Sequence, residues 1–70
     1  MRIICTKHAK EQLEERKIEY LWAESTIKSP DFTERKTLTK YMARKKLNGK
    51  SIEVIYTKER YIKIITVYWI

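Results

Sequence analysis

The sequence predicts an α+β fold: a two-layer sandwich in which two helices cover one face of an antiparallel sheet, in the order β-α-α-β-β-β. The second half of the chain alternates apolar and polar residues in three successive runs, which is typical of neighbouring strands. The first half carries two segments with helical spacing of apolar residues. Seventy residues are expected to form a single domain, residues 1–70.

The Asn48-Gly49 pair between two alternating runs predicts a tight β-hairpin. A type I′ turn needs positive φ at both central positions, which these two residues tolerate. The two-residue loop fixes the register, so Arg44 should lie opposite Glu53. One face then carries Tyr41, Ala43, Ile52, Val54 and Tyr56, with Lys45 and Leu47 near the turn, and the other carries Lys40, Met42, Arg44, Lys46, Ser51, Glu53 and Ile55.

The facing of the last strand depends on the turn at residues 58–60, which has no Gly or Asn to define its length. A loop of two or four residues places Ile65, Val67 and Trp69 on the apolar face, and an odd-length loop reverses the strand. We take the even case, which puts Ile64, Thr66 and Tyr68 on the basic face and Glu53 between Arg44 and Thr66.

The elements before the hairpin are a short β-branched strand at residues 2–5, helices at residues 7–17 and 19–29, and a polar connection at residues 31–37. Thr6 is a suitable N-cap for the first helix, and Pro30 ends the second. The helices should cover the apolar face. The opposite face would stay open, with Met42, Ile55, Ile62 and Ile64 exposed among cations, which is typical of a binding surface.

Charge is distributed unevenly along the chain. Residues 1–34 hold six basic and seven acidic side chains, whereas residues 35–70 hold ten basic and two acidic ones, for a net charge of +7. Such a basic half favours a polyanionic partner, although a solvated lysine-rich face has the same composition. The expected nucleic-acid-binding residues are Arg35, Lys36, Lys40, Lys45 and Lys50.

Composition excludes several functional classes. One Gly cannot form a glycine-rich phosphate loop, and one His with one Cys cannot complete a zinc site, so no metal or other cofactor is expected. Cys5 is interpreted as a small buried residue. No signal-peptide pattern or long apolar run is present, so we expect a cytoplasmic protein without a membrane partner. The high Lys, Glu, Ile and Tyr content is a compositional hint of a thermophile.

Four motifs together resemble a small uncharacterised domain family of the RelE/ParE-like toxin superfamily. They cover nearly the whole chain in order: Thr6-x-His8-Ala9, Glu15-Arg16-x-Ile18, Ser29-Pro30-Asp31, and Val54-Ile55-Tyr56 followed by Ile65-Thr66-Val67-Tyr68-Trp69. The chain departs from that family at Lys17, where Gly is usual, and at Glu19, where a Ser-like cap is usual. The resemblance implies a RelE-like fold and metal-independent RNA cleavage, and an antitoxin protein is one candidate partner.

The chemistry of RNA cleavage suggests roles for four side chains. Without a metal, the reaction needs a base for the 2′-OH, cations for the phosphorane and an acid for the 5′-oxygen. His8 suits a base, because a helix N-terminus disfavours its charged form, and Tyr68 suits an acid. Arg44 and Lys46 suit the phosphate. Each has a structural alternative: a loop contact for His8, a cross-strand pair with Glu53 for Arg44, a solvated lysine for Lys46, and sheet packing for Tyr68.

The sequence therefore predicts a RelE-like endoribonuclease toxin that acts on RNA, either free or on the ribosome. The alternative is a non-catalytic module of the same fold that binds nucleic acid or a protein. A third interpretation is that the uncovered apolar residues are buried in a homodimer or against an antitoxin segment; these are Met42, Ile55 and Ile64.

Overall fold

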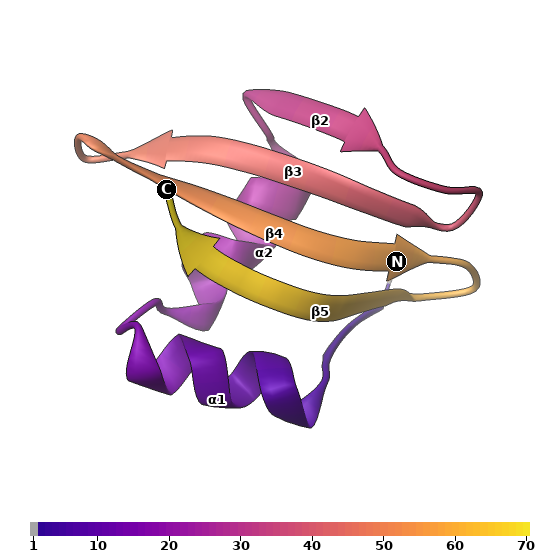
Figure 1. Cartoon of the computed structure of the whole chain (residues 1–70), viewed down its shortest axis with the longest axis horizontal. Coiled ribbons are helices and arrows are strands. Elements are labelled where there is room, and N and C mark those ends of the chain that lie inside the picture. Colours follow the sequence, from indigo (N-terminus) through magenta and orange to yellow (C-terminus); the bar gives the residue numbers. More distant parts are fainter. Residues whose placement is uncertain (1) are drawn as a thin grey trace.

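The computed structural model describes residues 2–70 as a five-stranded sheet with two helices packed on one face (Figure 1). The strands lie in the order β1-β5-β4-β3-β2. Both helices precede the four strands that make up most of the sheet. The elements are β1 (Ile3–Cys5), α1 (Lys7–Glu15), α2 (Tyr20–Lys28), β2 (Phe32–Arg35), β3 (Lys40–Leu47), β4 (Lys50–Lys58) and β5 (Ile62–Trp69).

The predicted α+β class is confirmed, with two differences in the sheet. First, β1 pairs with β5 in parallel, so the sheet is mixed rather than antiparallel. Second, a strand, β2, occupies the predicted polar connection and pairs antiparallel with β3. Asp31 holds the start of β2 against β3: its backbone N–H donates to the Arg44 carbonyl at 2.8 Å, and its Oδ2 accepts from the Lys46 N–H at 2.8 Å.

The Asn48-Gly49 hairpin is confirmed in both conformation and register. Asn48 and Gly49 have φ values of 49° and 83°, as a type I′ turn requires. Leu47 lies opposite Lys50, and Arg44 lies opposite Glu53. The short loop therefore determines which residues of β3 and β4 share a face.

The facing of β5 is more complex than predicted. The turn holds three residues, because Lys58 pairs with Ile62, and this odd length places Ile62 and Ile64 on the helix-covered face. A β-bulge at Ile65 then shifts the register by one residue. Val67 and Trp69 consequently lie on the helix-covered face, as predicted. The predictions for Ile62 and Ile64 were wrong, Ile65 has no partner on β4, and Glu53 lies opposite Tyr68 instead of Thr66.

The helix ends follow local capping chemistry. The Thr6 side chain accepts a hydrogen bond from the Ala9 N–H at 3.1 Å and caps α1. At the other end, the backbone N–H of Lys17 donates to the Glu14 carbonyl and that of Ile18 donates to the Leu13 carbonyl, which is a Schellman motif. Lys17 occupies its left-handed position, with φ of 53°.

The core lies between the helices and the sheet, and α2 is seen behind the strands in Figure 1. Ala9, Ala23 and Val54 are fully buried there, and so is Ile64. The predicted exposed apolar patch is wrong for Met42, Ile62 and Ile64, which are all buried; of the four, only Ile55 is partly exposed. Within residues 2–70, neither helix is long and apolar enough to cross a membrane.

Candidate functional site

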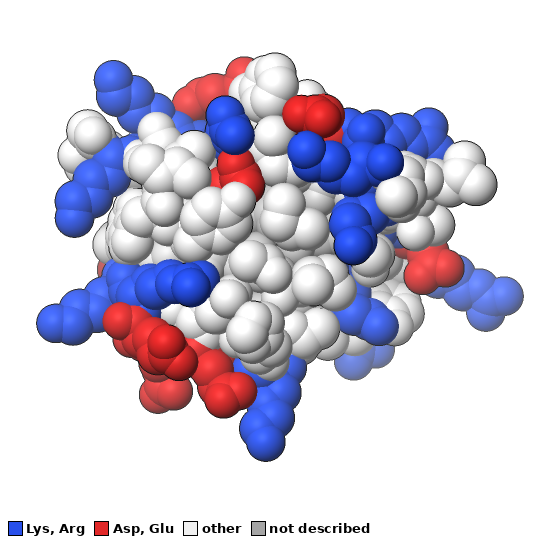
Figure 2. All heavy atoms as spheres, viewed as in Figure 1, with Lys and Arg blue, Asp and Glu red and all other residues white. Residues whose placement is uncertain are grey.

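The sheet face opposite the helices has no helix or strand of residues 2–70 packed on it (Figure 1). Figure 2 shows this face with uncharged side chains across its middle and Lys and Arg mainly around its margin. The middle includes Thr66 and the half-buried Ile55, which lie opposite each other on β5 and β4. A neutral centre with cations around it suits a ligand whose flat groups rest on the sheet and whose charges reach outward.

Three polar side chains form a row across this open face. Arg44 on β3 lies opposite Glu53 on β4, and Glu53 lies opposite Tyr68 on β5. Arg44 Nε contacts Glu53 Oε1 at 2.6 Å. The Glu53 side chain is 7% exposed and that of Arg44 is 47% exposed. We call these residues the Arg44–Glu53–Tyr68 row.

The arginine of the row is held in place yet keeps free donors. Its ion pair with Glu53 uses Nε, and no hydrogen bond in residues 2–70 involves the two terminal Nη nitrogens of Arg44. Its guanidinium carbon also lies 5.8 Å from the centre of the Phe32 ring on β2. A guanidinium positioned in this way presents its two terminal NH2 groups to a phosphate.

The predicted cations divide between the two faces. Lys40 and Lys46 are separated from Arg44 by an even number of positions along β3, so they point to the same face and are exposed on the open side. Lys45 points to the helix side, where its Nζ donates to the Ser29 carbonyl at the end of α2, at 2.7 Å. The three remaining predicted cations contact neighbouring groups of the protein. Lys50 lies over the Trp69 ring, and Lys36 pairs with Glu34. Arg35 lies over the Tyr41 ring and donates to the carbonyls of Thr37 and Leu38.

A model of a protein family described as a domain of unknown function, DUF4258, matches residues 5–69. The chain belongs to this family. No curated protein and no solved structure matches it significantly. The DUF4258 match includes β2, β3, β4 and β5, so the whole Arg44–Glu53–Tyr68 row lies inside it.

His8 of this DUF4258 domain is not part of the row. It lies in the first turn of α1, and its Nε2 is 3.0 Å from the Gln12 amide nitrogen. Gln12 in turn accepts a hydrogen bond from the Val67 N–H at 2.9 Å. No hydrogen bond or ion pair in residues 2–70 joins His8 to Arg44, Lys46 or Tyr68.

These α1 contacts complete the edge of β5. β1 pairs only with residues 62–64, which leaves the later part of β5 without a strand partner on that side. Gln12 binds the Val67 N–H there, and Arg16 Nη1 donates to the Val67 carbonyl at 2.8 Å. His8 contacts the Gln12 amide one turn along α1, and not the loop around Thr6 that the sequence suggested as its structural alternative.

Glu53 is the residue of the site that the sequence reasoning missed as a participant. The sequence predicts for it only a cross-strand ion pair with Arg44. Its isolation was an available signal, because it is one of just two acidic residues between positions 35 and 70. In the structure it is the only carboxylate in the row, with a cation on one side and a phenol on the other.

The remaining reactive groups do not form a second centre in the described residues. Among residues 2–70, no three His, Cys, Asp or Glu side chains are grouped closely enough to hold a metal ion. Burial raises the pKa of the Cys5 thiol, and the nearby Lys10 opposes this only in part. The thiol therefore stays protonated at neutral pH, which makes it a poor nucleophile.

Proposed function

We propose that this protein is a RelE-like endoribonuclease that cleaves single-stranded RNA on the open sheet face without a metal ion. The observation that carries the proposal is the Arg44–Glu53–Tyr68 row. It places a cation, a carboxylate and a phenol on three adjacent strands of the uncovered face. Neighbouring strands are about 4.8 Å apart, so the backbones of Arg44 and Tyr68 are separated by roughly 10 Å, and all three side chains can reach one phosphate group bound above the row.

Each member of the row has a role in the proposed reaction. The Glu53 carboxylate takes the proton of the 2′-OH, and the 2′-oxygen attacks the adjacent phosphorus. Arg44, through its free Nη groups, and Lys46 stabilise the added negative charge on the phosphorane. Tyr68 donates its proton to the departing 5′-oxygen. The products are a 2′,3′-cyclic phosphate and a free 5′-hydroxyl.

The RelE-like assignment is supported by the sequence motifs and by the arrangement of the elements. Both helices precede the antiparallel strands, and the lysine-rich strand β3 lies inside the sheet with its Arg44 and Lys46 on the open face. An RNA substrate, on or off the ribosome, and an antitoxin that blocks the open face are parts of the same proposal.

A second candidate is a non-catalytic module that binds RNA through the same face. Two observations favour it. His8 lies on α1 away from the row, so the side chain best suited to proton transfer at neutral pH does not take part. Glu53 is already paired with Arg44, which is how a purely structural cross-strand pair also looks.

A cleavage assay separates the two candidates. The purified protein is incubated with labelled single-stranded oligoribonucleotides in the presence of EDTA, with and without ribosomes. The endoribonuclease proposal predicts fragments ending in a 2′,3′-cyclic phosphate, which disappear in Glu53→Gln and Tyr68→Phe variants that still bind RNA. Binding without any cleavage under both conditions would contradict it and favour the non-catalytic module.

The matched control is His8→Ala. Because His8 acts on Gln12 and not on the substrate in this account, its removal should leave the cleavage products unchanged. Growth arrest on expression in a bacterium provides an independent readout. Arrest should be relieved by Glu53→Gln and Lys46→Ala but persist with His8→Ala. If His8→Ala relieves the arrest and Glu53→Gln does not, His8 and not Glu53 is the base, and the proposed mechanism is wrong.

A further inference from the structure

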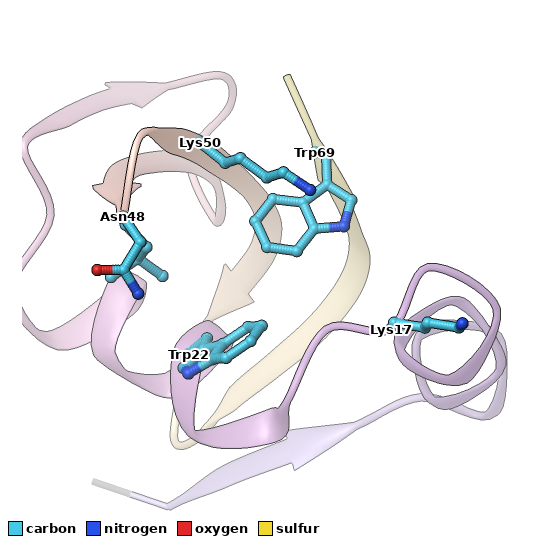
Figure 3. Close-up of a pocket in the computed structure, with 6 residues that line it drawn as sticks. Lys17, Trp22, Asn48, Lys50 and Trp69 are labelled. Atoms are coloured by element: carbon cyan, nitrogen blue, oxygen red, sulfur yellow. The ribbon is translucent and has the colours of Figure 1, made fainter.

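A second candidate site lies on the helix side of the sheet, at the tip of the β3–β4 hairpin. A cavity of about 310 Å³ opens there between the hairpin and the connection of the two helices (Figure 3). This volume lies at the lower end of the roughly 300–1,000 Å³ typical of small-ligand pockets. Its lining residues are Lys17, Trp22, Leu47, Asn48, Lys50 and Trp69.

Two indoles form the apolar wall of this pocket. The Trp22 and Trp69 rings have centroids 6.0 Å apart and are tilted by 59°. Trp69 is fixed in orientation because its indole N–H donates to the Arg16 carbonyl at 2.8 Å. An aromatic face held in place in this way stacks a flat ring at little cost in conformational entropy.

The polar side of the pocket is cationic. Lys50 extends over the Trp69 ring, with its Nζ 5.2 Å from the ring centre, whereas the Lys17 amine points away from the two indoles (Figure 3). Asn48 adds an amide that both donates and accepts hydrogen bonds. None of the lining residues is acidic. The pocket therefore combines a stacking surface, a base-edge partner and one positive charge.

We infer that this pocket binds one nucleobase that carries a phosphate. The base would stack on the indoles in the place that the Lys50 side chain occupies over Trp69. The Lys50 ammonium would move off the ring to pair with the phosphate, and the Asn48 amide would meet the polar edge of the base. This inference goes beyond the proposed function, because the pocket and the Arg44–Glu53–Tyr68 row lie on opposite faces of the sheet. The register places Leu47, Lys50 and Trp69 on the helix-covered face of the sheet. It places the Arg44–Glu53–Tyr68 row on the open face.

The test is a titration of the ¹⁵N-labelled protein with AMP, adenosine and inorganic phosphate, followed in two-dimensional NMR spectra. AMP should shift both indole N–H signals along one binding curve. Adenosine should shift the same signals with a Kd about tenfold higher, because it lacks the charge-assisted contact to Lys50. Indoles unmoved by AMP, or moved equally by phosphate alone, would overturn the inference.

Variants make the assignment specific. Lys50→Met should raise the Kd for AMP to that for adenosine and leave the adenosine value unchanged, whereas Lys7→Met, at an exposed lysine of α1, should change neither. Retention of the preference for AMP in Lys50→Met would overturn the role of Lys50. The spectrum of each variant without ligand shows directly whether it is folded.

The source of the base is decided by adding an unpaired oligoribonucleotide to the same sample. If the base belongs to an RNA strand, the oligonucleotide shifts both indoles at lower concentration than AMP does. If the natural ligand is a free nucleotide, AMP binds more tightly than the oligonucleotide. The NMR titration measures binding at the indoles and does not depend on RNA cleavage. It can therefore refute nucleotide binding in the pocket without bearing on the proposed cleavage at the open face.

Discussion

At the scale of single residues, Lys17 holds a backbone conformation that its side chain disfavours. It has φ of 53° because the Schellman motif at the end of α1 needs a left-handed residue there. The resemblance noted in the sequence places Gly at this position, so the departure was visible in advance. Glu19, the other departure, is the N-cap residue before α2 and makes no side-chain hydrogen bond to the helix.

Replacing Lys17 with Gly should stabilise the protein. Gly adopts positive φ without steric cost, which should raise the free energy of unfolding by about 0.5–1 kcal/mol after its extra freedom in the unfolded chain is counted. Urea denaturation measures the change. Lys17→Ala is the control, since it removes the amine but keeps the β-carbon, and an equal gain in both variants would show that backbone strain is not the cause.

Gln12 should matter more for stability than its exposed neighbour His8. Gln12→Ala leaves the buried Val67 N–H without its acceptor, which should lower the free energy of unfolding by about 1–3 kcal/mol. His8→Ala removes an exposed ring and should cost far less. Thermal unfolding of both variants checks this, and similar losses would mean that the Val67 contact is not a main support of the β5 edge.

At the scale of elements, the bulge in β5 explains a sequence pattern that simple alternation cannot. Ile62 and Ile64 lie at even-numbered positions of β5, and Val67 and Trp69 lie at odd-numbered positions. In a regular strand these two apolar pairs would therefore point to opposite faces. A regular strand can bury only one of these pairs, whereas one extra residue, Ile65, allows both to face the helices. This change of phase was the available signal for the bulge.

Deleting Ile65 should therefore prevent folding. Without the extra residue, one apolar pair of β5 turns to the open face, and the core loses either Ile62 and Ile64 or Val67 and Trp69. Ile65→Ala keeps the bulge and removes only a half-buried side chain, so it should remain folded with a modest loss of stability. Circular dichroism during heating compares the two, and a folded deletion variant would contradict the proposed role of the bulge.

β2 shows why some elements are hidden from sequence reasoning. All four of its residues are exposed, so no apolar face alternates with a polar one. It forms because Asp31 anchors its start and β3 offers unpaired backbone groups beside it. The β3–β4 hairpin was predictable in full because its turn residues and both its faces carry local signals.

At the scale of the whole molecule, the basic half of the sequence does not become a basic half of the surface. Strand alternation sends Lys40, Arg44 and Lys46 to the open face but Lys45 and Lys50 to the helix side. The sequence predicted this division for β3. The cross-strand neighbour of Tyr68 could not be predicted, because it depends on the bulge and on the length of a turn without Gly or Asn.

The open-face cations should account for a defined part of the salt dependence of RNA binding. Each phosphate contact contributes about 0.7 to the log–log slope for single strands, so Lys40→Ala combined with Lys46→Ala should reduce the slope by about 1.4. Lys7→Ala combined with Lys28→Ala removes the same charge from the helices and should leave the slope nearly unchanged. Equal reductions in both double variants would indicate non-specific attraction to the net charge.

The most direct measurement of the central claim is an NMR map of the protein bound to an oligonucleotide with 2′-deoxy sugars, which cannot be cleaved by 2′-OH attack. The proposed function predicts the largest shifts at the backbone signals of Arg44, Glu53 and Tyr68 and their neighbours on β3, β4 and β5. If the strand binds while the signals of these three residues stay at their free positions, the open face is not the RNA-binding surface and the proposed mechanism is wrong.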